Sequence, residues 1–537
     1  MENDDRSVSI LTAKSKIWHV LLAVVTIFSL ALVLRYIGLK FGFPLFTHPD
    51  EGYLMNAVRE MSLRRTSDPG TYVYPAYPSF YSRFLLAQNL SLRKFGGDYG
   101  HFYWRDPYLF IFSSRLLTAI QGALLPVIAW FIGRKFKGFN FALPAAALFI
   151  FYPPFVLHSH YVTVDIPLTL YVMAVLLFCL NYLSSNKNMW LVLACVFVAV
   201  AALEKYPGIL SFGIVLATIG IRAFNNDKQK KSPDWRFILK AAGLSLLIIA
   251  VTVLVVAPSL LLHFDTAWRQ IIQEARPYHL GSDGLGWGGN LLFYLKDFYS
   301  NVGLLICVFA AVGLAAAILT KDPAMLLLFF GSGYWIALSV LPLHHSRWSL
   351  PMMSTPLFLA AVGVSFLWQK TKHHRGGKIA VAFLILAGFV PFMLKGTVTS
   401  LMLTWQDTRN EALRYMEENG IAKDQTVSDG YSPYNPSNKN DIYAFDIFRP
   451  GEKKYLVLSS FMGERFAAEP ERYSAENAFY ANARSHLTLV KAFQPDPEPI
   501  YVTDQVRVII EYVKRQFSSS EAFFFTGPSL EIYRLPD

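Results

Sequence analysis

The chain has 537 residues, of which 53% are hydrophobic and 16% are charged. This balance excludes an intrinsically disordered protein, which is poor in apolar residues and rich in charge, and it argues against a purely soluble one, in which about 25% of residues are charged. The net charge is +11, but Lys and Arg lie mainly in short loops between apolar runs, so the charge indicates membrane topology and not a nucleic-acid surface. All three cysteines fall inside apolar runs and predict no disulfide framework and no redox chemistry.

Long apolar runs recur from the N-terminus to about residue 400. A bilayer crossing needs about 20 apolar residues, and on that criterion the sequence predicts a polytopic α-helical membrane protein with about eleven transmembrane helices. The first run has no small-residue cleavage site after it, so we expect a retained helix and not a removed signal peptide. The expected spans are 17–34, 113–133, 140–157, 166–183, 189–203, 207–222, 237–260, 302–320, 324–341, 352–368 and 379–399.

The loops between these spans differ in length and charge. If the N-terminus is cytoplasmic, every short loop on that side carries Lys or Arg, as the positive-inside rule requires. Two long loops, 40–112 and 261–301, then lie on the outer side together with the residues after 400. We therefore expect the polar architecture on the outer face, with membrane-parallel helices in the first long loop.

The residues after 400 form a compositionally different segment. Residues 407–420 read as an amphipathic helix with Asp407 as its N-cap and Gly420 as its stop. Strand-like runs follow at 454–459, 486–492 and 529–534. We expect two domains: a transmembrane domain over residues 1–399, and a soluble extracytoplasmic α/β domain over residues 400–537.

Adjacent carboxylates, Asp50 and Glu51, follow the first span. Carboxylates beside an apolar phase are costly unless they are paired or used. Asp50 is therefore a candidate general base, with Glu51 orienting it or holding a metal. The structural alternative is a helix start, because Thr47 and Asp50 are spaced as a capping box and acidic residues stabilise a helix N-terminus.

A second polar cluster lies at the outer end of the third and fourth spans. It contains His158, His160 and Asp165, which are suitable metal ligands or contacts for a polar substrate. The alternative is that the histidines are interfacial residues and that Asp165 caps the following helix.

Basic side chains on the same side could meet an anion. Lys205 lies between two apolar runs, where its stem can follow apolar surface; snorkelling or pairing with Glu204 is the alternative. Arg347 lies with His345 in a very short outer loop. Its guanidinium matches the geometry of phosphate, although an interfacial anchor would also fit.

Three further basic candidates lie in the loop 261–301. They are Arg269, Arg276 and His279. Their near-helical spacing beside the apolar boundary also fits a solvated amphipathic helix on the membrane surface.

These segments, in their order and outer placement, resemble the GT-C glycosyltransferases. The nearest groups are the relatives of protein O-mannosyltransferase and of aminoarabinose lipid A transferase. The resemblance covers most of the membrane portion and only the beginning of the residues after 400, and Trp348 stands where many relatives carry Tyr. It rests on the segments that begin at His48, Asp165, Lys205, Arg347 and Asp407.

The resemblance implies a transferase that moves a hexosyl or pentosyl group from a polyprenyl-phosphate carrier to an acceptor hydroxyl on the outer face. Asp50 would match the family's base or acceptor-orienting acid, with Glu51 as its partner and Asp165 as a second acid. Lys205 and Arg347 would match basic positions near the carrier phosphate. The residue types agree, since such a transfer needs a base and cations for the departing phosphate.

The expected transfer is inverting, because direct displacement needs no covalent enzyme intermediate. The sequence has no convincing nucleotide-binding fingerprint, and an activated lipid-linked sugar requires none. The sequence does not decide whether the reaction uses a divalent metal. Its candidate ligands are Asp50, Glu51, Asp165, His158 and His160.

Two other functions compete with this interpretation. A transporter or flippase for a lipid-linked sugar would use the same carboxylates and cations without reaction, and a membrane-tethered binding protein would act through the residues after 400. We expect a glycan, lipid or protein acceptor, contact with membrane lipids and no nucleic acid. The compact loops suit a bacterial inner membrane with undecaprenyl phosphate as the carrier.

Overall fold

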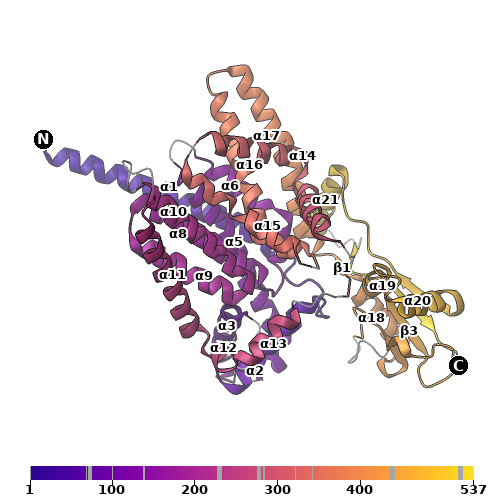
Figure 1. Ribbon diagram of the computed structural model, residues 1–537. Coiled ribbons are helices and arrows are strands. Elements are labelled where there is room, and N and C mark those ends of the chain that lie inside the picture. Colours follow the sequence, from indigo (N-terminus) through magenta and orange to yellow (C-terminus); the bar gives the residue numbers. More distant parts are fainter. Residues whose placement is uncertain are drawn as a thin grey trace.

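The computed structural model describes residues 2–67, 69, 75–98, 101–136, 140–225, 233–274, 280–281, 285–320, 322–341, 343–434, 442–517 and 524–536, with side chains from Ile17 onward. Helices make up the chain as far as Met402, and the described strands follow in the C-terminal region, which we define as the residues after 402 (Figure 1).

The membrane portion is a bundle of helices. Its elements are α1 (Glu2–Tyr36), α2 (Pro49–Arg64), α3 (Tyr77–Phe95), α4 (Phe102–Arg105), α5 (Pro107–Gly133), α6 (Ala142–Phe151), α7 (Pro153–His158), α8 (Asp165–Ser185), α9 (Asn188–Glu204), the 3₁₀ helix η2 (Tyr206–Ser211), α10 (Phe212–Asn225), α11 (Trp235–Val256), α12 (Pro258–Leu262), α13 (Phe264–Glu274), α14 (Trp287–Leu319), η3 (Pro323–Phe329), α15 (Phe330–Ser339), η4 (Ser346–Ser349), α16 (Leu350–Lys370) and α17 (Arg375–Met402).

Within the described residues, eight helices are long and apolar enough to cross a membrane. They include α1, α5, α8, α11, α14 and α17. The three other predicted spans correspond to shorter apolar helices, namely α6, α9 and the segment Pro323–Ser339. Every predicted apolar segment is helical, but the structure does not confirm eleven crossings, because these three fall below the length of about 20 residues that a crossing needs.

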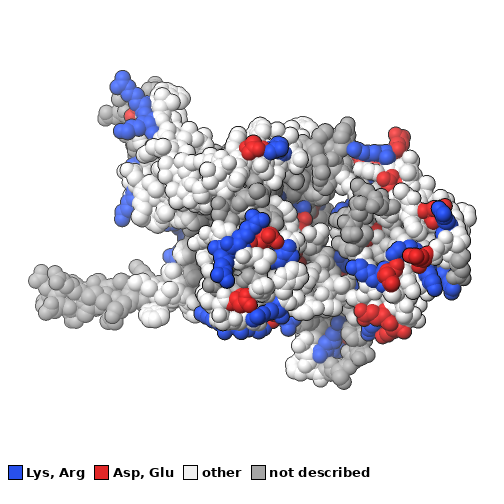
Figure 2. All heavy atoms as spheres, turned by 90° about the horizontal axis from the view of Figure 1, so that it is seen from below, with Lys and Arg blue, Asp and Glu red and all other residues white. Residues whose placement is uncertain are grey.

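The helices divide into a buried centre and an apolar rim. In α16, 83% of the most apolar window is buried, whereas in α11 only 11% is. Exposed apolar side chains such as Leu239 and Val255 on α11 therefore face lipid. Figure 2 shows the same contrast at the surface: charged side chains gather over the C-terminal region at the right and are sparse over much of the bundle.

Glycines bring the central helices α14 and α16 together. A Cβ atom on Gly313 would collide with the carbonyl oxygen of Leu359, and one on Gly363 would collide with that of Phe309. Small residues at such contacts let helix backbones approach closely, which is a common way to pack helices in a membrane.

The C-terminal region contains a mixed four-stranded sheet in the order β2-β3-β6-β4, with β2 and β3 parallel and β6 antiparallel to both β3 and β4. A parallel pair, β1 and β5, lies apart from it. The elements are β1 (Gln406–Asp407), α18 (Thr408–Glu418), β2 (Thr426–Ser428), β3 (Tyr455–Ser459), α19 (Ser460–Ala467), α20 (Ser474–His486), β4 (Thr488–Phe493), α21 (Val502–Phe517), β5 (Phe525–Thr526) and β6 (Leu530–Arg534).

These elements confirm the helix and the three strands predicted for this part of the sequence. Asp407 is the N-cap of α18, and its carboxylate accepts a hydrogen bond from the backbone N–H of Arg409. Gly420 follows the helix with a φ of 67°, a conformation that suits glycine. The domain boundary near residue 399 stays a proposal.

The predicted helices in the first long loop are present as α2, α3 and α4. In Figure 1, α2, α3, α12 and α13 lie together at one end of the bundle, and the C-terminal region lies beside that end.

Candidate functional site

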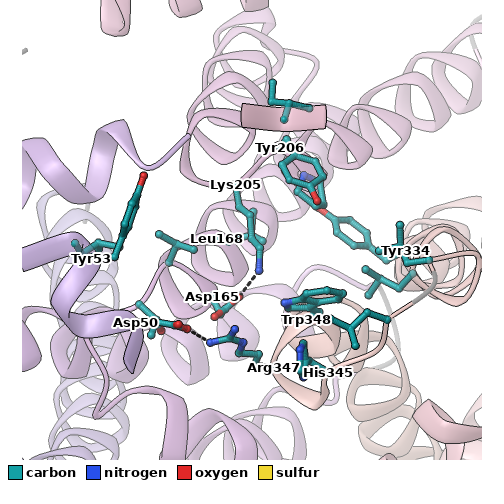
Figure 3. A pocket seen from close by; sticks show the side chains of 18 of the residues that line it. Asp50, Tyr53, Asp165, Leu168, Lys205, Tyr206, Tyr334, His345, Arg347 and Trp348 are labelled. Carbon is teal, nitrogen blue, oxygen red and sulfur yellow. Dashed lines mark hydrogen bonds and ion pairs between the residues drawn. The ribbon is translucent and has the colours of Figure 1, made fainter. Parts of the chain in front are cut away.

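A pocket of about 550 Å³ lies between the membrane helices and the loop helices. Its charged lining residues are Asp50, Asp165, Lys205 and Arg347, and they come from four separate segments of the chain (Figure 3). The pocket therefore brings together two acidic and two basic residues that the sequence analysis proposed for the site.

Asp50 lies in the first turn of α2, directly after Pro49. The His48 side chain makes no capping hydrogen bond to this helix. Asp50 faces the pocket, where its side chain is 40% exposed and its carboxylate forms an ion pair with Arg347 (Figure 3). The ion pair places a positive charge directly beside this carboxylate.

A second ion pair lies deeper in the same pocket. Lys205 Nζ is 2.9 Å from Oδ1 of Asp165, and the exposed fractions of the two side chains are 13% and 4%. Asp165 is the first residue of α8, and Lys205 links α9 to η2 in extended backbone. The alternative partner of Lys205, Glu204, instead accepts a hydrogen bond from Ser79.

The segment that carries Arg347 is anchored from α14. Asp297 accepts hydrogen bonds from the hydroxyl of Ser346, at 2.9 Å to each carboxylate oxygen. His345 lines the pocket, and its ring is 4.8 Å from that of Trp348 in an edge-on contact. Trp348 in turn lies under Lys205 Nζ, with 5.5 Å between the ammonium and the ring centre.

Glu51 does not join Asp50 in the pocket, contrary to our expectation. Its carboxylate is buried against Arg115, with Oε1 2.8 Å from Nε and Oε2 2.7 Å from Nη2. The backbone N–H of Val162 also donates to Oε1 at 3.0 Å. Because consecutive helix residues point about 100° apart, Asp50 faces the pocket while Glu51 ties α2 to α5 and to the loop before α8.

The two histidines of the second cluster also lie outside the pocket lining. His160 is buried, with Nδ1 2.8 Å from the carbonyl oxygen of Val156 and Nε2 2.8 Å from that of Ile37. His158 is half-buried at the end of α7 and contacts the Tyr161 ring edge-on.

The five candidate metal ligands therefore do not lie together in the structure. Asp50 and Asp165 line the pocket, while Glu51, His158 and His160 do not. Within the part of the chain that the structure describes, no three His, Cys, Asp or Glu side chains gather into a group that could hold a metal ion.

Among the basic candidates of the loop 261–301, Arg269 is described and does not line the pocket. Arg269 is 70% exposed and pairs with Asp265 one helical turn away, at 2.8 Å. Its helix, α13, instead contributes Gln270 and Gln273 to the lining. Arg276 and His279 lie outside the described residues.

Aromatic residues in the lining were missing from the sequence prediction. Tyr53, Tyr206 and Trp348 line the pocket, and Figure 3 shows their rings around the two ion pairs. Two of them could have been found from the sequence, because Tyr206 directly follows Lys205 and Trp348 directly follows Arg347.

His48, two residues before Asp50, packs against an aromatic ring. Its ring stacks on that of Tyr161, with 4.1 Å between ring centres. Burial, followed by the positive charge of Arg347, lowers the pKa of His48 to about 3. The imidazole is therefore neutral at physiological pH.

The C-terminal region holds the loop that leads to Asp50. The Arg409 guanidinium donates to the carbonyl oxygen of Thr47 at 3.0 Å, and the Asn410 amide donates to those of Gly42 and Phe43, each at 3.0 Å. Arg409 is itself fixed by the carboxylate of Asp407. We call these contacts of α18 with residues 42–47 the α18 clamp.

Part of the chain matches a known family. Residues 71–268 match the model of the dolichyl-phosphate-mannose-protein mannosyltransferase family. This range contains Asp165 and Lys205, and it lies between Asp50 and Arg347 in the sequence. The comparison with curated proteins finds no match.

Solved oligosaccharyltransferase structures from Archaeoglobus fulgidus share the fold at low sequence identity. The apo oligosaccharyltransferase of Archaeoglobus fulgidus is 12% identical with a TM-score of 0.56, over 96% of this chain and 88% of that chain. The oligosaccharyltransferase AglB from Archaeoglobus fulgidus, in complex with an inhibitory peptide and a dolichol-phosphate, is 13% identical with a TM-score of 0.54, over 97% and 89% of the two chains. ArnT from Cupriavidus metallidurans bound to undecaprenyl phosphate is 15% identical with a TM-score of 0.47, over 76% and 73%.

The helical bundle, the mixed C-terminal sheet and the family match agree with one another. The chain has the fold of the archaeal oligosaccharyltransferase structures, and its residues 71–268 match the model of the dolichyl-phosphate-mannose-protein mannosyltransferase family.

Proposed function

We propose that this protein transfers a sugar from a polyprenyl-phosphate carrier to an acceptor hydroxyl at the outer face of the membrane, with the pocket as its active site. One observation carries the proposal: Asp50, Arg347, Asp165 and Lys205 meet in one pocket although they come from four separate segments. Sugar transfer from a phosphate needs a base for the acceptor and cations for the departing phosphate, and these residues supply both.

The choice of carrier is supported by what the similar proteins are described to use. The matched family is named for dolichyl-phosphate mannose, and AglB was solved with a dolichol-phosphate. In this chain, a carrier phosphate would lie between Lys205 and Arg347, and its polyprenyl tail would lie along apolar helix surface. The sugar and the acceptor are not assigned by these residues.

The proposed reaction is a single displacement. The acceptor oxygen bonds to the anomeric carbon as the bond from that carbon to the phosphate oxygen breaks, and the electron pair leaves with the phosphate. Asp50 takes the hydroxyl proton, while Arg347 and Lys205 stabilise the charge on the released polyprenyl phosphate. Because attack and departure occur on opposite faces, the sugar inverts its configuration.

The distribution of charge favours an enzyme over a flippase. Asp165 is the first residue of α8, and Arg347 lies in η4 just before α16, so both lie at the ends of membrane helices. Transport proteins for charged substrates place such residues near the bilayer midplane. The basic short loops support an outer placement for this end of the bundle, and hence for the C-terminal region.

The proposal is tested by purified protein in vesicles, supplied with a panel of radiolabelled polyprenyl-phosphate sugars and crude acceptor fractions. We expect transfer from at least one donor. Arg347→Gln should raise the KM for that donor at least tenfold, because the phosphate loses a charged partner worth about 1.5–3 kcal/mol.

Arg269→Gln is the matched control, since Arg269 is exposed on α13 and pairs outside the pocket. It should leave KM unchanged. If no donor supports transfer while the protein moves the lipid-linked sugar across the bilayer, the flippase replaces the transferase.

A further inference from the structure

Helix α21 (Val502–Phe517) has three distinct faces. At about 100° per residue, the residues of each face recur at spacings of three and four. One face packs on the protein, one is apolar and exposed, and one is charged. This division is typical of a helix that lies at the boundary between protein, lipid and water.

The first face packs on the end of α17. Val508 is 5% exposed and forms one apolar cluster with Val398, Leu401 and Trp405. Since α17 ends at Met402, α21 lies against the last turns of a helix long enough to span the membrane. Figure 1 shows α21 beside α17 at the side of the bundle.

The second face is an exposed apolar stripe along the whole helix. Its members are Val502, Val506, Ile510, Val513 and Phe517, with exposed fractions of 45%, 39%, 47%, 48% and 87%. The preceding residues Ile500 and Tyr501 are 76% and 73% exposed. Such a contiguous stripe in water would be an aggregation liability and marks a contact surface.

The third face carries the charged groups. These are Asp504, Arg507, Glu511, Lys514 and Arg515, and Glu511 pairs with Lys514 at 2.9 Å. Arg507 lies three residues before Ile510 and Lys514 lies four residues after it, so both fall at the edge of the stripe. Basic side chains at that position can reach the headgroup level while their stems follow apolar surface.

The lipid-facing surface of α17 identifies what covers the stripe. Phe383, Leu386 and Val390 on α17 are 70%, 60% and 48% exposed, on a helix whose apolar window is 22% buried. The outer end of the same helix carries α21, so the stripe continues an apolar surface that is already in contact with lipid.

We propose that α21 is an interfacial helix that inserts its stripe into the outer boundary of the bilayer and holds the C-terminal region against the membrane. Its partner is the acyl-chain and headgroup boundary of the lipid leaflet. This inference goes beyond sugar transfer and does not depend on it.

Spin labels on the full-length protein test the proposal. Single cysteines would be placed at Val506, Ile510 and Val513 on the stripe and at Glu511 on the charged face, in a Cys307→Ser background, because Cys179 and Cys195 are buried. The labelled protein would be reconstituted in nanodiscs of phosphatidylethanolamine and phosphatidylglycerol. Collision rates with oxygen and with a water-soluble nickel chelate then report the depth of each label.

We expect the three stripe labels to collide more with oxygen and the Glu511 label to collide more with the nickel chelate. Stripe labels open to the chelate would overturn the proposal. Stripe labels shielded from both reagents would overturn it as well, since a second copy of the chain or another protein would then cover the stripe.

A substitution adds a second readout. Ile510→Asp should shift the label at Val513 toward the chelate several-fold, because a carboxylate does not partition into the leaflet. Glu511→Ala, on the charged face, should leave that label in the lipid. Equal effects of the two variants would contradict a lipid contact specific to the stripe.

Discussion

Two neighbouring carboxylates of similar chemistry have opposite surroundings. Asp50 is 40% exposed and faces a pocket, whereas Glu51 is buried with both oxygens bound to Arg115. Loss of activity in a Glu51 variant would therefore not identify a catalytic group, because an unpaired buried Arg115 would destabilise the fold.

The two ion pairs of the pocket should differ in their effect on stability. Lys205→Gln leaves the buried Asp165 carboxylate without its cation and should lower the free energy of unfolding by about 3–5 kcal/mol. Arg347→Gln acts on a pair that is partly in water and should cost about 1 kcal/mol or less. Thermal unfolding in detergent measures both.

The double variant Lys205→Gln with Asp165→Asn controls for side-chain packing. It should recover most of the stability lost in Lys205→Gln, since no buried charge is left unpaired. A double variant as unstable as Lys205→Gln would contradict this explanation.

The half-buried His48 should make the protein sensitive to acid. The pKa of His48 is about 3 in the folded protein, against about 6.5 for an ordinary histidine. Below pH 6.5 the unfolded chain binds a proton that the folded chain does not, so stability falls as the pH drops from about 6.5 toward 3, by up to about 1.4 kcal/mol per pH unit.

Melting temperatures of wild type and His48→Gln between pH 7.5 and 4.5 test this. The variant should lose less stability on acidification, and replacement of His486, exposed on α20, should leave the profile unchanged. Parallel profiles for wild type and His48→Gln would show that His48 titrates normally.

At the scale of elements, α18 couples the C-terminal region to the pocket. The α18 clamp fixes residues 42–47, which lead into the turn that carries Asp50. Because a catalytic group displaced by about 1 Å can cost a factor of about 100 in rate, the clamp should matter for turnover more than for carrier binding.

Asn410→Ala removes two hydrogen bonds of the clamp and should lower kcat by about 10- to 100-fold with little change in the KM of the carrier. Asn419→Ala, near the other end of α18, removes a hydrogen bond to Tyr415 on the same helix and serves as the control. Steady-state transfer kinetics compare the two. A kcat for Asn410→Ala equal to that of the control would refute a positioning role.

Local patterns were sufficient to predict several elements. The N-cap at Asp407 and the strand-like runs at 454–459 and 529–534 depend on a few neighbouring residues, and the corresponding helix and strands are present. Contacts over long separations were not predictable in this way. Glu51 and Arg115 are 64 residues apart, and Thr47 and Arg409 are 362 apart, so no local pattern reveals their pairing.

On the scale of the whole molecule, the bundle separates a lipid-facing rim from a polar end. The apolar runs predicted the helices, because burial in lipid leaves a strong signal in composition. They did not fix the number of crossings, since α6 and α9 are shorter than a full span. The same polar end carries the pocket lining from α2, α8 and η4 and adjoins the C-terminal region (Figure 1).

One measurement tests directly whether Asp50 acts as the base. Single-turnover transfer and carrier binding would be compared between wild type and Asp50→Asn, which preserves the shape of the side chain and removes its basicity. We predict that the rate of transfer falls by a factor of about 100 to 10,000, while the Kd of the carrier stays within about threefold. Transfer at the wild-type rate by Asp50→Asn would contradict the account.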